Sequence, residues 1–236
     1  MQDNSNRKTA IIVGVLFLTA LGTSILGSAG FVGPIINTPD YLADVYPNRT
    51  QVMTGMLLEL TCAVAVVGIA VLLFPIINKY NKSIALGYLG LRIIESVLIC
   101  ASAISLLSLL TLSQEYVKAA APDTSSFHTS GILASAGYYW AFQIVILVCG
   151  VAGVMLCYLL YQSRLVPRSV SVLGIIGYPL SLVPPLLDMF GHSAGMIAFL
   201  PGSLFEIILP IWLIVKGFNL SVTTSESAQI DSNETR

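Results

Sequence analysis

Residues 51–77 read QVMTGMLLELTCAVAVVGIAVLLFPII and carry a single charged side chain, that of Glu59. A hydrocarbon core about 30 Å thick is crossed by roughly 20 apolar residues in a helix that rises about 1.5 Å per residue. The run is continuously apolar, without the strict alternation of a membrane β-strand, and a helix satisfies its own backbone hydrogen bonds where water is absent. It therefore predicts a transmembrane helix.

Five other stretches share this character, and the composition of the whole chain agrees with them. Hydrophobic residues make up 56% of the chain and charged residues 10%, whereas a soluble domain has about 25% charged residues to cover its surface. We therefore expect an all-α polytopic membrane bundle with six transmembrane helices, placed in the cell membrane and in contact with its lipids. The expected spans are residues 9–29, 51–77, 83–112, 136–161, 169–190 and 194–218.

Lysine and arginine are unevenly divided between the two sides that these spans define. Cytoplasmic loops of multi-pass proteins carry an excess of positive residues, so the richer side predicts cytoplasmic N and C termini. Residues 1–8 then form a short cytoplasmic N-terminus, residues 9–218 the transmembrane domain, and residues 219–236 a polar tail, which we expect to be disordered because it has few apolar residues to bury. The richer side carries eight such residues (Arg7, Lys8, Lys79, Lys82, Arg164, Arg168, Lys216 and Arg236) and the other side two (Arg49 and Lys118).

The first span has a basic start and an apolar middle, as signal peptides do. Its apolar run is longer than a signal-peptide core, and Ser28-Ala29-Gly30 is a weak cleavage sequence. We therefore expect this span to stay uncleaved.

The first outer loop contains Thr38-Pro39-Asp40, a hydroxyl, a proline and an acid in the order that begins many helices. Two interpretations are open. The loop can form a short helix at the membrane interface, with tyrosines at headgroup level, or it can be an ordinary connection over the helix ends.

Five ionisable side chains fall within the expected spans, where Asp, Lys or Arg costs about 2.5–3.5 kcal/mol at a helix centre. At 1.5 Å per residue in a core of about 30 Å, Glu59 and Glu95 lie roughly 12 Å below the outer surface and Glu206 roughly 18 Å below it. Arg92 shares a helix face with Glu95, three residues further on. We therefore expect these four residues to meet in one polar layer near the middle of the membrane. The fifth, Asp188, lies near the outer end of its span and resembles an interfacial cap.

This layer is a candidate site for ligand binding or proton relay. Arg92 can neutralise one of the three glutamates, and a buried carboxylate without a cation takes up a proton. We therefore expect at least one of these glutamates to be protonated near neutral pH. Polar residues on the faces that point into the bundle would support the site, namely Tyr88, Tyr139, Gln143, Tyr178 and Asp188.

Three classes of function are compatible with this pattern. In a transporter-like or sensor-like protein, the polar layer binds a small polar or cationic ligand or relays protons. In an accessory or structural membrane protein, the same ion network only specifies helix packing. An intramembrane enzyme has the least support, because the sequence contains no P-loop, dinucleotide-binding glycine pattern or GxSxG elbow, and no catalytic residue is assigned.

The sequence predicts no cofactor, no metal site and no binding of nucleic acid. His128 and His192 lie in separate loops, and a net charge of −1 gives no electrostatic basis for binding a polyanion. No pattern specifies an oligomeric state. The cysteines lie within apolar runs, without metal-ligand spacing, at Cys62, Cys100, Cys149 and Cys157.

Three segments together resemble a prokaryotic multi-pass membrane family known as domain of unknown function 4386. Residues 91–95 (LRIIE) are similar to its Arg-x-x-Glu segment, residues 163–168 (SRLVPR) with 173–174 to its loop between the fourth and fifth helices, and residues 206–218 to its closing helix. The resemblance extends from about residue 8 to residue 218. It implies a multi-pass membrane protein and brings no established activity, so no functional residue is carried over.

Overall fold

The computed structural model describes residues 2–119, 124–192 and 195–219, which are helical with short connections and contain no strand. Most of the predicted tail therefore lies outside the described residues. The helices are α1 (Gln2–Ile25), the π-helix η1 (Leu26–Val32), α2 (Gly33–Ile36), α3 (Tyr41–Asp44), α4 (Arg49–Ile77), α5 (Lys82–Lys118), α6 (Thr124–Ser163), α7 (Arg168–Met189), the 3-10 helix η2 (Met196–Phe199) and α8 (Leu200–Val215).

Within the described residues, six helical segments are long and apolar enough to cross a membrane, which confirms the predicted helical membrane bundle. Three of them are much longer than expected, since the first ends at Ile36 instead of residue 29, the third ends at Lys118 instead of residue 112 and the fourth begins at Ser125 instead of residue 136. The expected spans ended where the apolar run ended, but a helix continues through polar residues once its backbone bonds are formed. The segments are Asn6–Ile36, Arg49–Ile77, Lys82–Lys118, Ser125–Ser163, Arg168–Met189 and Ile197–Val215.

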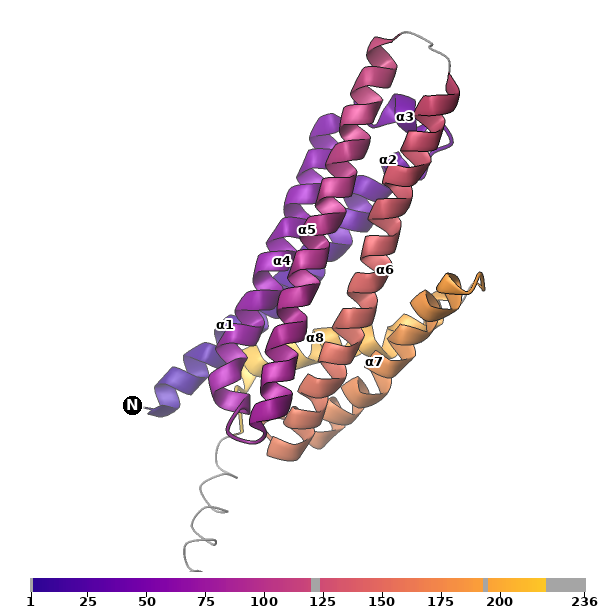
Figure 1. Cartoon of the computed structure of the whole chain (residues 1–236). Coiled ribbons are helices and arrows are strands. Elements are labelled where there is room, and N and C mark those ends of the chain that lie inside the picture. Colours follow the sequence, from indigo (N-terminus) through magenta and orange to yellow (C-terminus); the bar gives the residue numbers. More distant parts are fainter. Residues whose placement is uncertain (1, 120–123, 193–194, 220–236) are drawn as a thin grey trace, which may run out of the picture. The chain divides into compact units, whose positions relative to one another are not determined.

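The chain forms two compact units, which are described separately. Unit 1 comprises Met1–Val15, Ile69–Leu89 and Gly150–Arg236, and unit 2 comprises Leu16–Gly68 and Gly90–Cys149. Helices α1, α4, α5 and α6, which are labelled in Figure 1, contribute residues to both units. Helices α7, η2 and α8 belong to unit 1, and η1, α2 and α3 belong to unit 2.

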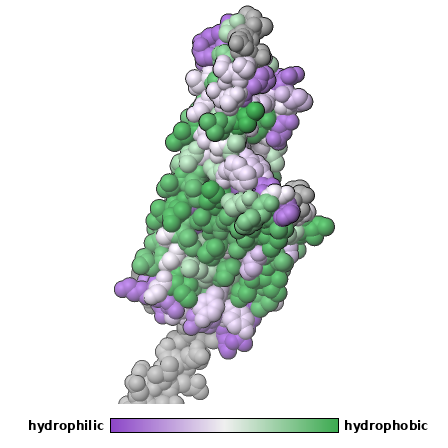
Figure 2. Space-filling model, turned by 45° about the vertical axis from the view of Figure 1, so that its right-hand side comes forward, coloured by the Kyte–Doolittle hydropathy of each residue, from purple (hydrophilic) through white to green (hydrophobic). Residues whose placement is uncertain are grey.

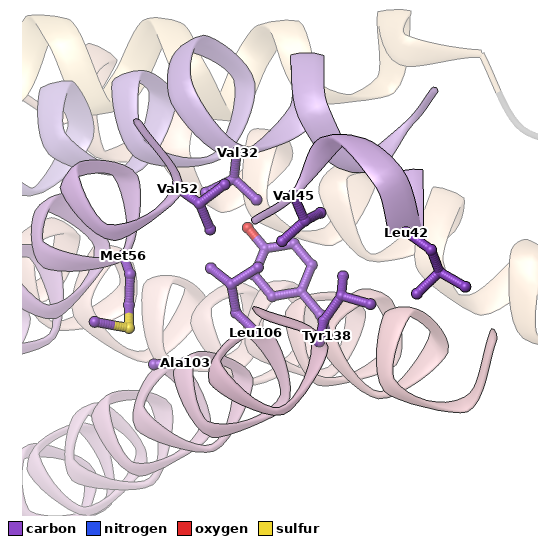
Figure 3. Close-up of a cluster of buried hydrophobic side chains, with 9 residues drawn as sticks. Val32, Leu42, Val45, Val52, Met56, Ala103, Leu106 and Tyr138 are labelled. Atoms are coloured by element: carbon purple, nitrogen blue, oxygen red, sulfur yellow. The ribbon is translucent and has the colours of Figure 1, made fainter. Parts of the chain in front are cut away.

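Unit 2 has an apolar core that joins the first loop to α4, α5 and α6. The Tyr138 ring lies among aliphatic side chains of this core, close to Val45 and Leu106 (Figure 3). The buried hydroxyl of Ser113 on α5 donates to the carbonyl of Leu42 at 2.6 Å and accepts the amide of Tyr46 at 2.8 Å, so it fixes the loop to α5. The core residues are Val32, Leu42, Val45, Val52, Met56, Ala103, Leu106, Leu109 and Tyr138.

The first loop does contain a short helix, α3, but its start differs from the expected one. The helix begins at Tyr41 after Asp40, and no side chain caps it. The Thr38 hydroxyl instead bonds to the carboxylate of Asp44 at 2.8 Å and to the carbonyl of Ile35 at 3.0 Å. Burial raises the pKa of Tyr41, whose hydroxyl lies close to Gly131 of α6. The loop is therefore held by buried contacts with α5 and α6.

In unit 1, glycines allow α7 and α8 to approach closely. A Cβ on Gly177 of α7 would lie 2.6 Å from the amide nitrogen of Gly202 in α8. Small residues at such crossings bring backbones together in membranes, where water does not drive helix association. The C-terminal carbonyls of α8 accept hydrogen bonds from the Arg7 guanidinium at 2.8–3.1 Å. A cation at this end also complements the helix dipole.

Large apolar side chains cover much of the molecular surface. Val64, Leu133 and Ile197 are each at least 75% exposed, and hydrophobic residues dominate a broad part of the visible face (Figure 2). Soluble monomers rarely expose contiguous apolar patches larger than a few hundred Å². Such a surface is suited to contact with lipid acyl chains.

The Gly177 contact predicts that glycine-to-alanine substitutions at positions 177 and 90 differ strongly in their effect on stability. Gly177→Ala should destabilise the protein by about 1–3 kcal/mol, because the new Cβ meets backbone that cannot rotate away. Gly90→Ala on α5 should be neutral or stabilising, because no atom lies within 4 Å of the new Cβ and alanine favours the helix. Thermal unfolding in detergent measures both. Equal stability of the two variants would contradict the close contact.

Candidate functional site

Unit 2 contains a buried ion pair on α5. Nη1 of Arg92 donates to Oε1 and Oε2 of Glu95 at 3.0 and 2.8 Å, and each residue is 3% exposed. The same nitrogen lies 3.7 Å from the sulfur of Cys149 on α6. Because a guanidinium keeps its proton in proteins, it can hold Glu95 as a carboxylate. A guanidinium and a carboxylate paired in this way carry no net charge.

A second buried acid, Glu59 on α4, is bonded to a neutral partner. The Tyr138 hydroxyl on α6 donates to Oε1 of Glu59 at 2.5 Å, and the two residues are 7% and 3% exposed. The other oxygen, Oε2, is buried and has no hydrogen-bond partner among the described residues. Glu59 therefore has one oxygen held by α6 and one oxygen with unused acceptor capacity.

The π-helical turn of η1 packs directly against this acid. A Cβ on Gly27 would lie 2.8 Å from the carbonyl oxygen of Gly55 and 3.0 Å from Cγ of Glu59. One turn away, the carbonyl of Phe31 accepts a hydrogen bond from Gln51 of α4 at 3.0 Å. Turns of this wider, π-helical kind are rare in proteins, and those that occur are often found at functional sites. Here it forms the wall of the Glu59 site.

Unit 1 contains a separate polar contact. The Tyr178 hydroxyl on α7 donates to Oε1 of Glu206 on α8 at 3.2 Å, with Tyr178 buried and Glu206 partly exposed. Tyr88 is fully buried in α5, and Asp188 is partly exposed near the end of α7. Since these four residues belong to unit 1, their convergence with Glu59, Arg92 and Glu95 stays a prediction.

Tyr138 of α6, the buried partner of Glu59, is the neighbour of Tyr139, the residue that the sequence analysis selected. Tyr139 is 46% exposed, and its hydroxyl accepts a hydrogen bond from Gln143 at 2.8 Å. Neighbouring helical residues point about 100° apart, so Tyr138 faces the core instead. Buried positions recur every seven residues on this face, but the adjacent register is equally apolar, so the sequence alone does not distinguish the two tyrosines: the buried positions are Gly131, Tyr138, Val145, Ala152 and Leu159.

The ion pair predicts an asymmetry between single and double substitutions. Glu95→Met should destabilise the protein by about 3–5 kcal/mol, because it leaves a buried guanidinium that cannot lose its charge. The double variant Arg92→Met/Glu95→Met should recover most of that loss, because methionine fills similar volume without charge. Unfolding in detergent compares them. A double variant as unstable as the single one would show that charge pairing is not the cause.

Comparison with known proteins agrees with the family resemblance. A family model described as Domain of unknown function (DUF4386) matches residues 12–217. No curated protein and no solved structure matches the chain. The matched region includes most of the first span and the five others. The chain therefore belongs to the DUF4386 family and is an integral membrane protein with six candidate spans.

Proposed function

We propose that this protein acts in the cell membrane as a transporter-like or sensor-like protein in which the Glu59 carboxyl takes up a proton or binds a small polar or cationic ligand. The observation that carries the proposal is the buried Oε2 of Glu59, which has no hydrogen-bond partner among the described residues. A carboxyl group in such a place is well suited to exchange a positive charge.

The charge balance of unit 2 supports this assignment. Arg92 is paired with Glu95 at 2.8 Å, and no lysine, arginine or histidine among the described residues lies within ion-pair distance of Glu59. An isolated carboxylate in an apolar interior is strongly unfavourable. A proton or a bound cation would remove that cost, so Glu59 is the acid that we assign to exchange.

The rival function is purely structural, and one observation favours it. The Glu59–Tyr138 hydrogen bond joins α4 to α6, as a buried polar contact that selects helix partners would do. The Arg92–Glu95 pair fits that role less well, because both residues belong to α5. The two functions differ in one measurable property, which is whether Glu59 exchanges protons or ligand while the protein stays folded.

We also propose that both termini face the cytoplasm. The support is the excess of lysine and arginine on that side, eight residues against two. Alkaline phosphatase fused after residue 46 should then be active outside the cytoplasm, and the same enzyme fused after residue 81 should be inactive. The reverse pattern would invert the topology.

Substitution of Glu59 should remove proton or cation binding without unfolding the protein. In the wild type, we expect either a protonated-carboxyl infrared band at neutral pH or thermal stabilisation by an added cation. Glu59→Gln should abolish whichever signal is present, and Tyr138→Phe should shift it because Oε1 loses its donor.

The matched control is Glu115→Gln, which changes an exposed glutamate on α5. It should leave the signal and the melting temperature unchanged. If Glu59→Gln altered stability but neither proton nor cation binding, the structural role would be the correct one.

A further inference from the structure

A cavity lies beside the Glu59 site, between η1 and the beginning of α4. Its volume is about 440 Å³, and none of its lining residues carries a charge. Glu59 does not line it. The lining residues are Gly30, Phe31, Pro47, Asn48, Thr50, Gln51 and Thr54.

Three polar side chains of this lining donate a hydrogen bond to a backbone carbonyl. The amide nitrogen of Asn48 bonds to the carbonyl of Asp44 at 2.9 Å, and that of Gln51 bonds to the carbonyl of Phe31 at 3.0 Å. The hydroxyl of Thr54 donates to the carbonyl of Thr50 at 2.8 Å. Each residue thereby keeps its side-chain oxygen as an acceptor. These acceptor oxygens can coordinate a cation or a water-bound proton.

The cavity and Glu59 are connected by one face of α4. Gln51, Gly55 and Glu59 are four residues apart, so they lie on the same side of the helix over roughly 12 Å. All three contact the same wall, because Gln51 bonds to Phe31 of η1, and Gly55 and Glu59 pack against Gly27. The face therefore leads from the cavity to the acid.

At Gly55 this face of α4 is packed against the backbone of Gly27 and the side chains of Phe31 and Val32. A Cβ on Gly55 would lie 2.9 Å from the carbonyl oxygen of Gly27 and 2.7 Å from Cγ2 of Val32. The glycine pair is thus the narrow point between the cavity and Glu59. At the end of η1, the amide of Gly33 bonds to the carbonyl of Ser28, five residues back, which is the spacing of a π-helix.

We propose that this cavity is the vestibule through which a small cation, a proton carried by water or a monovalent metal ion, reaches Glu59 from the side where α4 begins. This inference rests on the proposed function, since it needs Glu59 to exchange a positive charge. It adds the route, the chemical class of ligand and the glycine constriction.

The test uses the full-length protein in liposomes of neutral phospholipid and follows the carboxyl infrared signal that Glu59→Gln removes. A sudden change of pH or of Na⁺ concentration is applied on the vestibule side. Thr54→Trp should fill the cavity and slow the response roughly tenfold, the effect of a barrier higher by about 1.4 kcal/mol, while its final amplitude is unchanged. Thr61→Trp places the same side chain on an exposed position of α4 and should respond at the wild-type rate.

Separate changes of pH and of Na⁺ concentration distinguish a proton from a metal ion as the ligand of Glu59. A response to pH that is unaffected by Na⁺ identifies a proton, and a response to Na⁺ at constant pH identifies a metal ion. Either response, slowed by Thr54→Trp alone, supports the vestibule. A wild-type rate in Thr54→Trp would overturn the vestibule and leave the function of Glu59 intact. Absence of any Glu59 signal in the wild type would overturn both.

If the tryptophan variant does not fold, two variants of opposite charge at Thr50 test the vestibule instead. Thr50 is exposed in the first turn of α4 and lines the cavity, roughly 13 Å from Glu59 along the helix. Thr50→Glu should lower the cation concentration at half response roughly twofold at low ionic strength, and Thr50→Lys should raise it by the same factor. High salt should cancel both shifts. Equal values in the two variants would overturn the vestibule.

Discussion

A charged side chain in the hydrocarbon core must be neutralised by the protein, because no water is present to solvate it. Unit 2 meets this constraint in two ways. Glu95 is held by Arg92, a cation that does not titrate, whereas Glu59 is held by the neutral hydroxyl of Tyr138. The first arrangement fixes the charge state of its acid, and the second leaves the charge of Glu59 to be balanced from elsewhere.

Glycine contacts determine where these acids lie. Apolar burial drives association of membrane helices only weakly, so close backbone approach and internal hydrogen bonds have to supply the attraction. In unit 2, the contact of Gly27 with Gly55 presses the π-helical turn against Glu59. In unit 1, the contact of Gly177 with Gly202 brings the backbones of α7 and α8 close together. The polar groups can bond at normal distances because these glycines let the backbones meet.

The sequence was sufficient for the fold class and the six spans, since hydropathy follows directly from composition and length. It also placed Arg92 and Glu95 on one helix face, because residues three apart share a face whatever the tertiary structure, but it left open which glutamate Arg92 pairs with. It did not identify Tyr138, since choosing between adjacent tyrosines requires the rotation of α6 against its neighbours. It also gave no sign of the π-helical turn, which depends on the packing of glycines between two helices. Local periodicity thus predicted most of the fold. In the unit 2 site it identified Glu59, Arg92 and Glu95 but not Tyr138.

The two oxygens of Glu59 can serve different purposes, so the structural role of this acid is compatible with the charge exchange that we propose. Oε1 accepts the Tyr138 hydroxyl and so maintains the link between α4 and α6. Oε2 has no hydrogen-bond partner among the described residues, so a proton or cation can bind there without displacing Tyr138. Because the carboxyl group offers several lone pairs, its occupation at one oxygen leaves the other able to accept. Helix packing and the proposed charge exchange therefore do not compete for the same oxygen of Glu59.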